Sequence, residues 1–365
     1  MKTFTTSYER ILSLVDNYKP DLYAKTRNFL DGTVSCLSPY ISRGVISTRT
    51  VYDSLIKRGY NLEKIEKFVQ ELAWRDYWQS QWKFYGIKIN KDLRHTQQAF
   101  HNHGMPHCLV KGQCSIQMFN TAIKQLNSTG YLHNHMRMYL AMSICNIGSY
   151  HWHKPAQWMY YNLIDGDWAS NALSWQWVAG CLNSKKYIAN QENINKYCGS
   201  SEVRTFLDKP YDQLSKVQSL DEFDNSVELE LKWRVPQQAN PNELVLDDCL
   251  IYNYYNLDPQ WRKEQLANRI LLLEPQIFDQ YPISPRVMDF FLKLSKNIPN
   301  LILFTGSFAE LRALCRGKIF YRQHPLNQYS GTEDSQPKLC NIQGDFSSFF
   351  KYWKLCKKAL INERN

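Results

Sequence analysis

The stretch LIDGDWASNALSWQWVAG, residues 163–180, holds the densest group of side chains that could do chemistry. Asp165 and Asp167 are carboxylates that are costly to bury unless they are paired or hydrogen-bonded. On a helix, Asp167 and Asn171 share one face, and the tryptophans of the stretch gather on another. The pattern predicts the wall of a pocket for a large ligand with polar and aromatic parts. The alternative is an ordinary core helix that begins with a capping Asp.

Residues 61–85 predict one long helix, because their apolar positions recur at helical spacing and tryptophans follow at intervals of four. Glu71 and Arg75 lie four apart inside this aromatic helix, next to Trp74. They are candidates for a binding face. A surface ion pair between Glu71 and Arg75, with the indoles packed in a core, is the alternative.

Two further segments carry polar side chains on predicted helices. Ser38 and Pro39 resemble a helix cap followed by a proline at the first helical position, where backbone amides can hold a phosphate. After a turn at residues 127–130, Asn134 and Arg137 are three apart and share a helix face. A first helix is predicted over residues 6–18, with four apolar residues on its inner side: Ile11, Leu12, Leu14 and Val15.

The charge of the 365-residue chain is concentrated in its first part. Residues 1–200 contain 23 Lys and Arg against 13 Asp and Glu, which accounts for the whole net charge of +10, and they hold eight of the eleven Trp. Lys and Arg neutralise phosphates and flat rings stack on bases, so this part suits a nucleic acid. A basic surface that only solvates the protein is the alternative.

Ten cysteines without regular spacing indicate reduced thiols rather than a disulfide framework. No apolar run is long enough for a signal peptide or a membrane helix, so we expect a cytoplasmic protein without a membrane contact. Residues 86–115 gather His and Cys in a spacing that fits no familiar zinc site, and we expect no metal there: His95, His101, His103, His107 and Cys108.

The second part of the chain differs in character. Short apolar runs at residues 269–275, 300–306 and 319–325 alternate with helical segments, which predicts a parallel sheet. No glycine-rich phosphate fingerprint accompanies them. The expected fold is therefore mainly α, a helical bundle followed by a small α/β domain with a short parallel sheet. The expected boundaries are a helical domain at 1–204, a linking or bracing segment at 205–245 and an α/β domain at 246–365.

Four motifs across residues 23–180 match one family in order and approximate spacing: LSPYISRGVIS, ELAWRDYW, LNSTGYLHNHMRM and LIDGDWASNALSWQW. Together they resemble the FAD-binding helical domain of the cryptochrome and photolyase family. YAKTRN and WRDYW are most similar to DASH-type cryptochromes, whereas HNHMRM is closer to photolyases that act on cyclobutane pyrimidine dimers.

The resemblance implies a U-shaped FAD in a helical bundle. It places the FAD phosphates beside four residues: Tyr23, Ser35, Leu37 and Ser38. It places the isoalloxazine beside four others, with Arg137 and Asp165 paired next to the ring: Asn134, Arg137, Asp165 and Asp167. Asn171 matches the residue that faces flavin N5 and governs the protonation of the flavin. Phe68 stands near the FAD where a Trp is common, and Arg75 is a further cavity contact.

The resemblance also implies residues for repair and for DNA binding. Glu71 matches the acid that hydrogen-bonds the damaged base, and Met138 matches the methionine that lines the lesion pocket. DNA contacts are expected from five residues, of which His135 replaces a common Arg: Arg27, Trp74, His135, Trp177 and Lys185.

Trp175 and Trp152 match the first two members of the family's electron-transfer triad. The distal Trp has no clear counterpart, and Phe100 stands near its place. Because Phe is harder to oxidise than Trp, photoreduction is expected to slow, stop or use a Tyr such as Tyr160 or Tyr161.

The function that the resemblance implies is FAD-dependent, blue-light-driven repair, in which an electron from reduced FAD opens a cyclobutane pyrimidine dimer in single- or double-stranded DNA. The protein would act as a monomer. One alternative is a cryptochrome-like photoreceptor or redox sensor that signals through a protein partner without repair. Another is a plain FAD-containing redox or binding protein. The sequence leaves open whether an antenna chromophore binds as well.

The order of domains departs from the family, in which an α/β antenna domain precedes the FAD domain. The segment GDFSSFFKYWKLCKKAL is similar to the end of that antenna domain, so the C-terminal domain is interpreted as a relocated or circularly permuted antenna-like domain. An unrelated α/β domain is the alternative. KYIANQENINKYC faintly resembles a segment of photolyases with an iron–sulfur cluster, but Cys198 has no close second Cys, and ordinary thiols are the better interpretation.

Overall fold

A computed structural model describes residues 3–217, 219–236, 247–342 and 344–363. The chain divides into two compact units. Unit 1 comprises residues 1–3, 20–34 and 85–231, and unit 2 comprises residues 4–19, 35–84 and 232–365. Residues 237–245 of the expected linking segment lie outside the described residues, as does residue 218.

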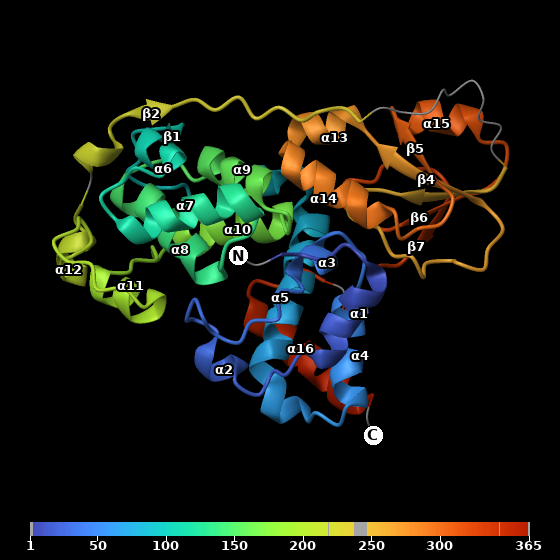
Figure 1. Cartoon of the computed structure of the whole chain (residues 1–365), viewed down its shortest axis with the longest axis horizontal. Coiled ribbons are helices and arrows are strands. Elements are labelled where there is room, and N and C mark those ends of the chain that lie inside the picture. The colour runs from blue at the N-terminus through green and yellow to red at the C-terminus, as the bar shows by residue number, and fades with distance from the viewer. Residues whose placement is uncertain (1–2, 218, 237–246, 343, 364–365) are drawn as a thin grey trace. The chain divides into compact units, whose positions relative to one another are not determined.

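Unit 1 is mainly helical (Figure 1). Its helices are α2 (Tyr23–Thr26), η1 (Gly86–Asn90), α6 (His107–Lys111), α7 (Gln117–Thr129), α8 (Asn134–Met142), η2 (Ser143–Ile147), α9 (His153–Asn162), α10 (Trp168–Ala179), α11 (Gln191–Cys198), α12 (Tyr211–Leu214) and η3 (Asp221–Phe223). Gly130 ends α7 with a φ of 69°, a backbone conformation that suits glycine. The turn predicted at residues 127–130 is therefore confirmed at its last residue.

The helix α10 begins and ends as its sequence dictates. The side chain of Asp167 accepts a hydrogen bond from the Ser170 amide at 2.8 Å, and Gly180 ends the helix with a φ of 85°. Eight of the twelve residues of the helix are buried. The capping Asp of the simpler interpretation is thus present, and it starts a core helix that presents both polar and indole side chains.

Residues 205–217 and 219–231 belong to unit 1. The strand β2 (Ser226–Val227) pairs antiparallel with β1 (Met105–Pro106). Phe223 is buried in the same unit and accepts a hydrogen bond at its carbonyl oxygen from the Tyr150 hydroxyl at 2.5 Å. The segment is therefore packed rather than only linking.

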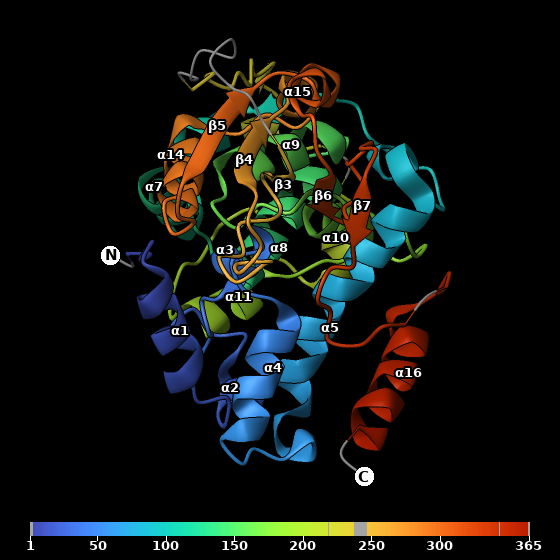
Figure 2. The ribbon, with the colours of Figure 1, turned by 90° about the vertical axis from the view of Figure 1, so that its right-hand side faces the viewer.

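Unit 2 contains a five-stranded parallel sheet with the strand order β5-β4-β3-β6-β7, visible side by side in Figure 2. Its strands are β3 (Cys249–Tyr252), β4 (Asn268–Leu273), β5 (Leu301–Thr305), β6 (Ile319–Arg322) and β7 (Thr332–Asp334). The parallel sheet and the strands β4, β5 and β6 are confirmed. The central strand β3 and the edge strand β7 were not expected, because runs of four and three residues are too short to show a period.

Helices cover both faces of this sheet. The helices of unit 2 are α1 (Tyr8–Asn17), α3 (Ser38–Ser42), α4 (Thr48–Lys57), α5 (Leu62–Tyr85), α13 (Pro275–Gln280), α14 (Pro285–Ser295), α15 (Phe308–Leu314) and α16 (Phe349–Asn362), where the last residue of α5 belongs to unit 1. Leu311 of α15 packs in one core cluster with Ile251 and Ile270. The chain crosses from β4 to β5 through α13 and α14, and it returns from β5 to β6 through α15. Because right-handed crossovers that run in opposite directions along a sheet lie on opposite faces, α13 and α14 cover one face and α15 covers the other.

Two expectations for the first helices were wrong in part. In α1, Ile11 and Val15 are buried, but Leu14 is 45% exposed and Leu12 is half-buried. Ile11 and Val15 are four positions apart and share the buried face of the helix, whereas Leu12 and Leu14 lie on either side of that face. Ser38 does not cap α3: the cap position is Leu37, without a side-chain hydrogen bond, and the helix is five residues long. The expected Ser38 cap is therefore wrong, whereas the phosphate contact expected at this segment stays a prediction.

The two units also differ from the domains expected at 1–204 and 246–365. Residues 4–19 and 35–84, including α4 and α5, cluster with the C-terminal sheet and not with α7 to α10. For example, Trp353 and Lys357 of α16 donate to the carboxylate of Glu66 in α5 at 3.2 and 2.9 Å. Composition along the chain cannot reveal such packing between segments that are hundreds of residues apart.

Candidate functional site

Arg137 and Asp165 form an ion pair in unit 1. Arg137 Nη2 donates to both carboxylate oxygens of Asp165, at 2.8 and 3.0 Å, and Arg137 Nε donates to the Leu132 carbonyl at 2.8 Å. The side chain of Asp165 is 4% exposed and that of Arg137 is 21% exposed. The predicted pairing is confirmed. The guanidinium nitrogens Nε and Nη2 of Arg137 donate hydrogen bonds within unit 1, and Nη1 can donate to a further acceptor.

Asn171 lies one turn into α10. Its side-chain amide nitrogen donates to the carbonyl oxygen of Ala156 in α9 at 2.8 Å, so the amide orientation is set by a neighbouring helix. The side chain is half-buried. An amide held in this way can offer its oxygen to a ligand while carrying no charge.

The other expected contacts of α8 lie at its start. Asn134 is exposed, and its amide nitrogen lies 3.9 Å from the Met138 sulfur one turn later. His135 packs against its own unit: its ring stacks on Tyr139 at 4.4 Å, and its Nδ1 lies 2.8 Å from the Asn28 carbonyl oxygen. Partial burial lowers the pKa of His135, which favours the neutral imidazole.

Trp152 and Trp175 are both buried, at 0% and 2% exposure. The indole nitrogen of Trp152 donates to Asp92 at 2.6 Å, and Asp92 also pairs with His151 at 3.4 Å. Partial burial alone would raise the pKa of Asp92, but hydrogen bonds from His151, the Gln97 amide and Trp152 lower it to about 2. A carboxylate that stays ionised therefore contacts the indole N–H. Asp92 was missed, because nothing in the sequence links it to a tryptophan 60 positions later.

Phe100 lies beside His151, the neighbour of Trp152. The ring centroid of Phe100 lies 4.9 Å from that of His151 and 5.0 Å from that of His103. The aromatic contacts of Trp152 therefore continue through His151 to Phe100, at 5.8 and 4.9 Å. The expectation that Phe100 stands near the place of a distal Trp stays a prediction.

The remaining expected DNA contacts of unit 1 lie at its surface. Trp177 is 37% exposed and its ring lies 5.8 Å from that of Tyr187. Lys185 is exposed, and Arg27 is half-buried after the short helix α2, which begins at Tyr23. The DNA-binding roles of Trp177, Lys185 and Arg27 stay predictions.

Unit 2 contains the remaining residues that were predicted to contact FAD or DNA. Phe68 is buried, with its ring 4.8 Å from that of Tyr18. Trp74 stacks face to face on Phe349 of α16 at 3.7 Å and lies 5.0 Å from the ring of Trp78, and its stacking on a base stays a prediction. Arg75 Nη1 donates to the Ser42 hydroxyl at 3.3 Å.

Glu71 is half-buried on α5, as are Ser35 and Ser38 on their own segment, whereas Leu37 is buried. The predicted contacts of these four residues with FAD or DNA stay predictions.

Metal binding finds no support in the described residues. Among residues 3–217, 219–236, 247–342 and 344–363, no group of three or more His, Cys, Asp or Glu could hold a metal ion. Within the same ranges, no helix is both long and apolar enough to cross a membrane.

The donor set of unit 1 fits a flavin ring. A flavin ring edge offers carbonyl oxygens, ring nitrogens and one N–H, which need donors and an acceptor that are already oriented. Arg137 offers Nη1, Asp165 offers carboxylate oxygens that are fixed by the ion pair, and Asn171 offers an amide oxygen. The residue types and their fixed side chains therefore suit such a ligand.

Comparison with known proteins supports this interpretation. Residues 68–210 match the FAD binding domain of DNA photolyase. The deoxyribodipyrimidine photo-lyase of Buchnera aphidicola subsp. Baizongia pistaciae is 30% identical over 186 residues, which cover 45% of this chain and 39% of that protein. An enzyme of the same name from Thermus thermophilus is 31% identical over 162 residues, which cover 43% of this chain and 38% of that protein. The chain thus spans about two fifths of the length of these relatives.

Among solved structures, a class III photolyase from Agrobacterium tumefaciens aligns with a TM-score of 0.48 and 25% identity, covering 53% of this chain and 43% of that one. The match of residues 68–210 includes Arg137, Asp165, Asn171 and both buried tryptophans. FAD is the cofactor of the matched domain. Residues 68–210 of this chain are therefore similar to the FAD binding domain of DNA photolyase, and the photolyase relatives are each matched over part of their length.

Proposed function

We propose that this protein is an FAD-dependent lyase that uses blue light to repair cyclobutane pyrimidine dimers in DNA. The observation that carries the proposal is the partly buried Arg137–Asp165 pair next to α10, inside the segment that matches a photolyase FAD domain. Relatives named deoxyribodipyrimidine photo-lyase support it, although each is matched over part of its length. When bound and reduced, FAD would supply the electron that splits the dimer.

Within this proposal, each group of residues has a separate task. Arg137 and Asp165 orient the ring system, and Asn171 holds an uncharged amide beside it. Trp175 and Trp152 supply electrons from the protein, with the Asp92 carboxylate positioned to stabilise positive charge on Trp152.

DNA binding is proposed for the same protein, acting as a monomer. Residues 1–200 carry the whole charge surplus, which favours association with phosphates. Arg27, His135, Trp177 and Lys185 are the proposed DNA contacts of unit 1. In unit 2, Glu71 is the proposed hydrogen-bond partner of the damaged base and Trp74 is a proposed stacking residue.

The decisive experiment measures restored thymines in dimer-containing DNA, single- and double-stranded, after incubation with the FAD-loaded reduced protein under blue light. We expect light-dependent repair that is absent in the dark. Glu71→Gln should lower repair by roughly tenfold or more, because a hydrogen bond to a charged group is lost. Protein that retains FAD but repairs neither substrate in the light would defeat the proposal.

A second candidate is a flavin photoreceptor or redox sensor without repair activity. It is favoured by Phe100 at the position beside His151 where an outer Trp is expected, because this arrangement changes how electrons reach the flavin. The same assay separates the two: a protein whose flavin responds to light but which leaves dimers intact belongs to the second class.

A further inference from the structure

The helix α16 of unit 2 has one side that packs into the fold and one side that does not. The packed side consists of five buried residues: Phe349, Tyr352, Trp353, Cys356 and Leu360. On its border, Lys357 and the Trp353 indole bind the carboxylate of Glu66 in α5, the helix that lies beside α16 in Figure 2. The opposite side of α16 is exposed.

Three exposed lysines lie in the middle of this side: Lys351, Lys354 and Lys358. They fall within about 60° of one another around the helix and are called the lysine face below. The helix has four Lys and no Asp or Glu, whereas residues 201–365 as a whole contain 21 Lys and Arg and 21 Asp and Glu. Lys357 is paired with Glu66 at 2.9 Å, and the three lysines of the face form no ion pair with any residue that the structure describes. The lysine face therefore concentrates positive charge that is not neutralised within the fold.

The spacing of these lysines is unfavourable for the helix by itself. Lys351 and Lys354 are three positions apart, and Lys354 and Lys358 are four apart, so like charges are neighbours on the helix surface. Such pairs destabilise a helix, and α16 has no acidic residue that offsets them. A partner with regularly spaced negative charges would replace this repulsion by attraction.

Apolar side chains border the lysine face on both edges. Phe350 and Ile361, which are 68% and 43% exposed, follow one edge, and Leu355, which is 47% exposed, lies on the other. A helix that binds a membrane surface buries its apolar face among the lipids. The apolar face of α16 is already buried in unit 2, and the middle of its exposed side is charged. This order favours a polyanion such as DNA over a lipid surface.

The length of the lysine face matches the spacing of phosphates in DNA. Lys351 and Lys358 are seven residues apart, which is about 10 Å along a helix. One strand of a DNA duplex carries about three phosphates over the same distance along its axis. Each of the three ammonium groups can therefore meet a separate phosphate of one strand.

One end of the lysine face adjoins a proposed DNA contact of the same unit. Phe349, the first residue of α16, stacks on Trp74 of α5 at 3.7 Å. Trp74 is the proposed stacking residue for a base, and the exposed Phe350 follows directly after Phe349. The lysine face thus continues from the proposed contact with the lesion along one helix of unit 2.

We propose that the lysine face of α16 binds the phosphate backbone of the DNA next to the lesion. The inference rests on the proposed function, because it takes DNA as the partner. It adds a substrate-holding role for a helix that has no part in the light-driven chemistry. Phosphate contacts position DNA without reading its bases, so the face acts equally on damaged and undamaged DNA.

The test compares the full-length, FAD-loaded protein in the dark with a triple variant that carries Lys351→Gln, Lys354→Gln and Lys358→Gln. Fluorescence anisotropy measures binding to labelled duplexes with and without a dimer, between about 50 and about 200 mM salt. Each lost phosphate contact lowers the slope of log K against log salt by about 0.9, so we expect the slope to fall by about 2 to 3. The affinity for both duplexes should fall by at least about tenfold at the lowest salt.

A second triple variant is the matched control. Lys263→Gln, Lys296→Gln and Lys318→Gln remove the same charge from exposed positions of unit 2 outside α16, and the slope should stay within about one of the parent value. Gln and Lys have similar helix propensities, so the lysine-face variant should keep its helix, which circular dichroism verifies. With saturating DNA it should repair dimers at the parent rate, because these lysines hold DNA and do not touch the reacting atoms.

Unchanged affinity and salt slope in the folded lysine-face variant would overturn the proposal, as would an equal loss in the control variant. Vesicles of phosphatidylserine and phosphatidylcholine are the second probe. Vesicle binding that is lost in the lysine-face variant, with DNA binding intact, would assign the face to a membrane and overturn the proposal. A parent protein that binds no DNA would defeat this inference together with the proposed function. A parent that repairs dimers while the lysine-face variant binds DNA equally well would defeat this inference alone.

Discussion

The two oxygens of the buried Asp165 carboxylate lie 2.8 and 3.0 Å from the same nitrogen, Nη2 of Arg137. Replacing Arg137 by Gln keeps a polar side chain but leaves a carboxylate that is 4% exposed without its cation. We expect R137Q to lower the free energy of unfolding by about 3 kcal/mol and to reduce FAD retention. Chemical denaturation and the flavin absorbance of the purified protein measure the two effects.

A matched control is Lys293→Gln, which breaks the exposed pair with Asp289, whose side chains are 55% and 60% exposed. This change should cost no more than about 1 kcal/mol. Similar losses in both variants would contradict a special role for the Arg137–Asp165 pair.

Asn171 is expected to influence the flavin without anchoring it. Asn171→Asp replaces the amide that donates to the Ala156 carbonyl at 2.8 Å with a carboxylate that cannot donate. We expect N171D to retain FAD but to change the absorption spectrum of the flavin after blue-light illumination. An unchanged spectrum in protein with full FAD content would argue against the predicted position of Asn171 beside N5.

The outer end of the tryptophan pathway is testable at two positions. Trp152→Phe removes a buried, oxidisable ring, and we expect slower light-driven reduction of bound FAD. Phe100→Trp places an indole beside His151 and should accelerate the light-driven reduction of bound FAD. Flash photolysis with absorbance detection measures both rates.

Trp158→Phe is the control, because Trp158 is also buried in unit 1, on α9, but has no predicted role in electron transfer. If W158F slows reduction as much as W152F, the pathway through Trp152 is wrong. A rate in F100W equal to that of the parent would show that Phe100 does not occupy the outer position.

Asp76 should make stability depend on pH. Burial raises its pKa to about 6, against the opposing hydrogen bonds from the Leu339 amide and Thr48, whereas the unfolded carboxyl ionises near pH 4. Between these values the folded protein binds more protons than the unfolded chain, so stability falls as pH rises from about 4 to about 6. The loss contributed by this group is about 3 kcal/mol and is complete above pH 6.

Asp76→Asn removes the titrating group, so the fall in stability between pH 4 and 6 should become smaller by about that amount. Denaturant titrations across this range provide the measurement. Asp31→Asn, at an exposed position, should leave the dependence as it is. A D76N protein with the same pH dependence as the parent would rule out the raised pKa.

Local patterns were enough to predict much of the fold. The helices α5, α7 and α10 follow from the spacing of apolar residues and from caps, and β4, β5 and β6 follow from apolar runs separated by helices. These signals are local, since they depend on neighbours within one or two turns or on one strand. The strand β3 shows the limit of this approach: four residues carry no period, and only its pairing with both β4 and β6 makes it the centre of the sheet.

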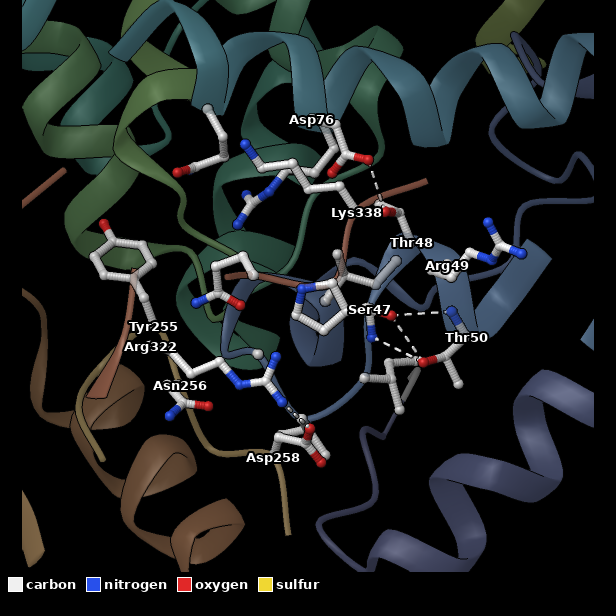
Figure 3. Close-up of a pocket in the computed structure, with 18 of the residues that line it drawn as sticks. Ser47, Thr48, Arg49, Thr50, Asp76, Tyr255, Asn256, Asp258, Arg322 and Lys338 are labelled. Atoms are coloured by element: carbon white, nitrogen blue, oxygen red, sulfur yellow. Dashed lines mark hydrogen bonds and ion pairs between the residues drawn. The ribbon is translucent and has the colours of Figure 1, made fainter. Parts of the chain in front are cut away.

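The sequence by itself indicated a resemblance to the photolyase FAD-binding domain, through four motifs in order, and the residue types that suit a flavin. The tertiary structure decided which residues meet. Arg137 and Asp165 are 28 positions apart, Trp152 and Asp92 are 60 apart, and one pocket of unit 2 is lined by residues from Ser47 to Lys338 (Figure 3). Contacts of this kind depend on the burial of whole helices and strands against one another, and no periodicity or spacing along the chain encodes them.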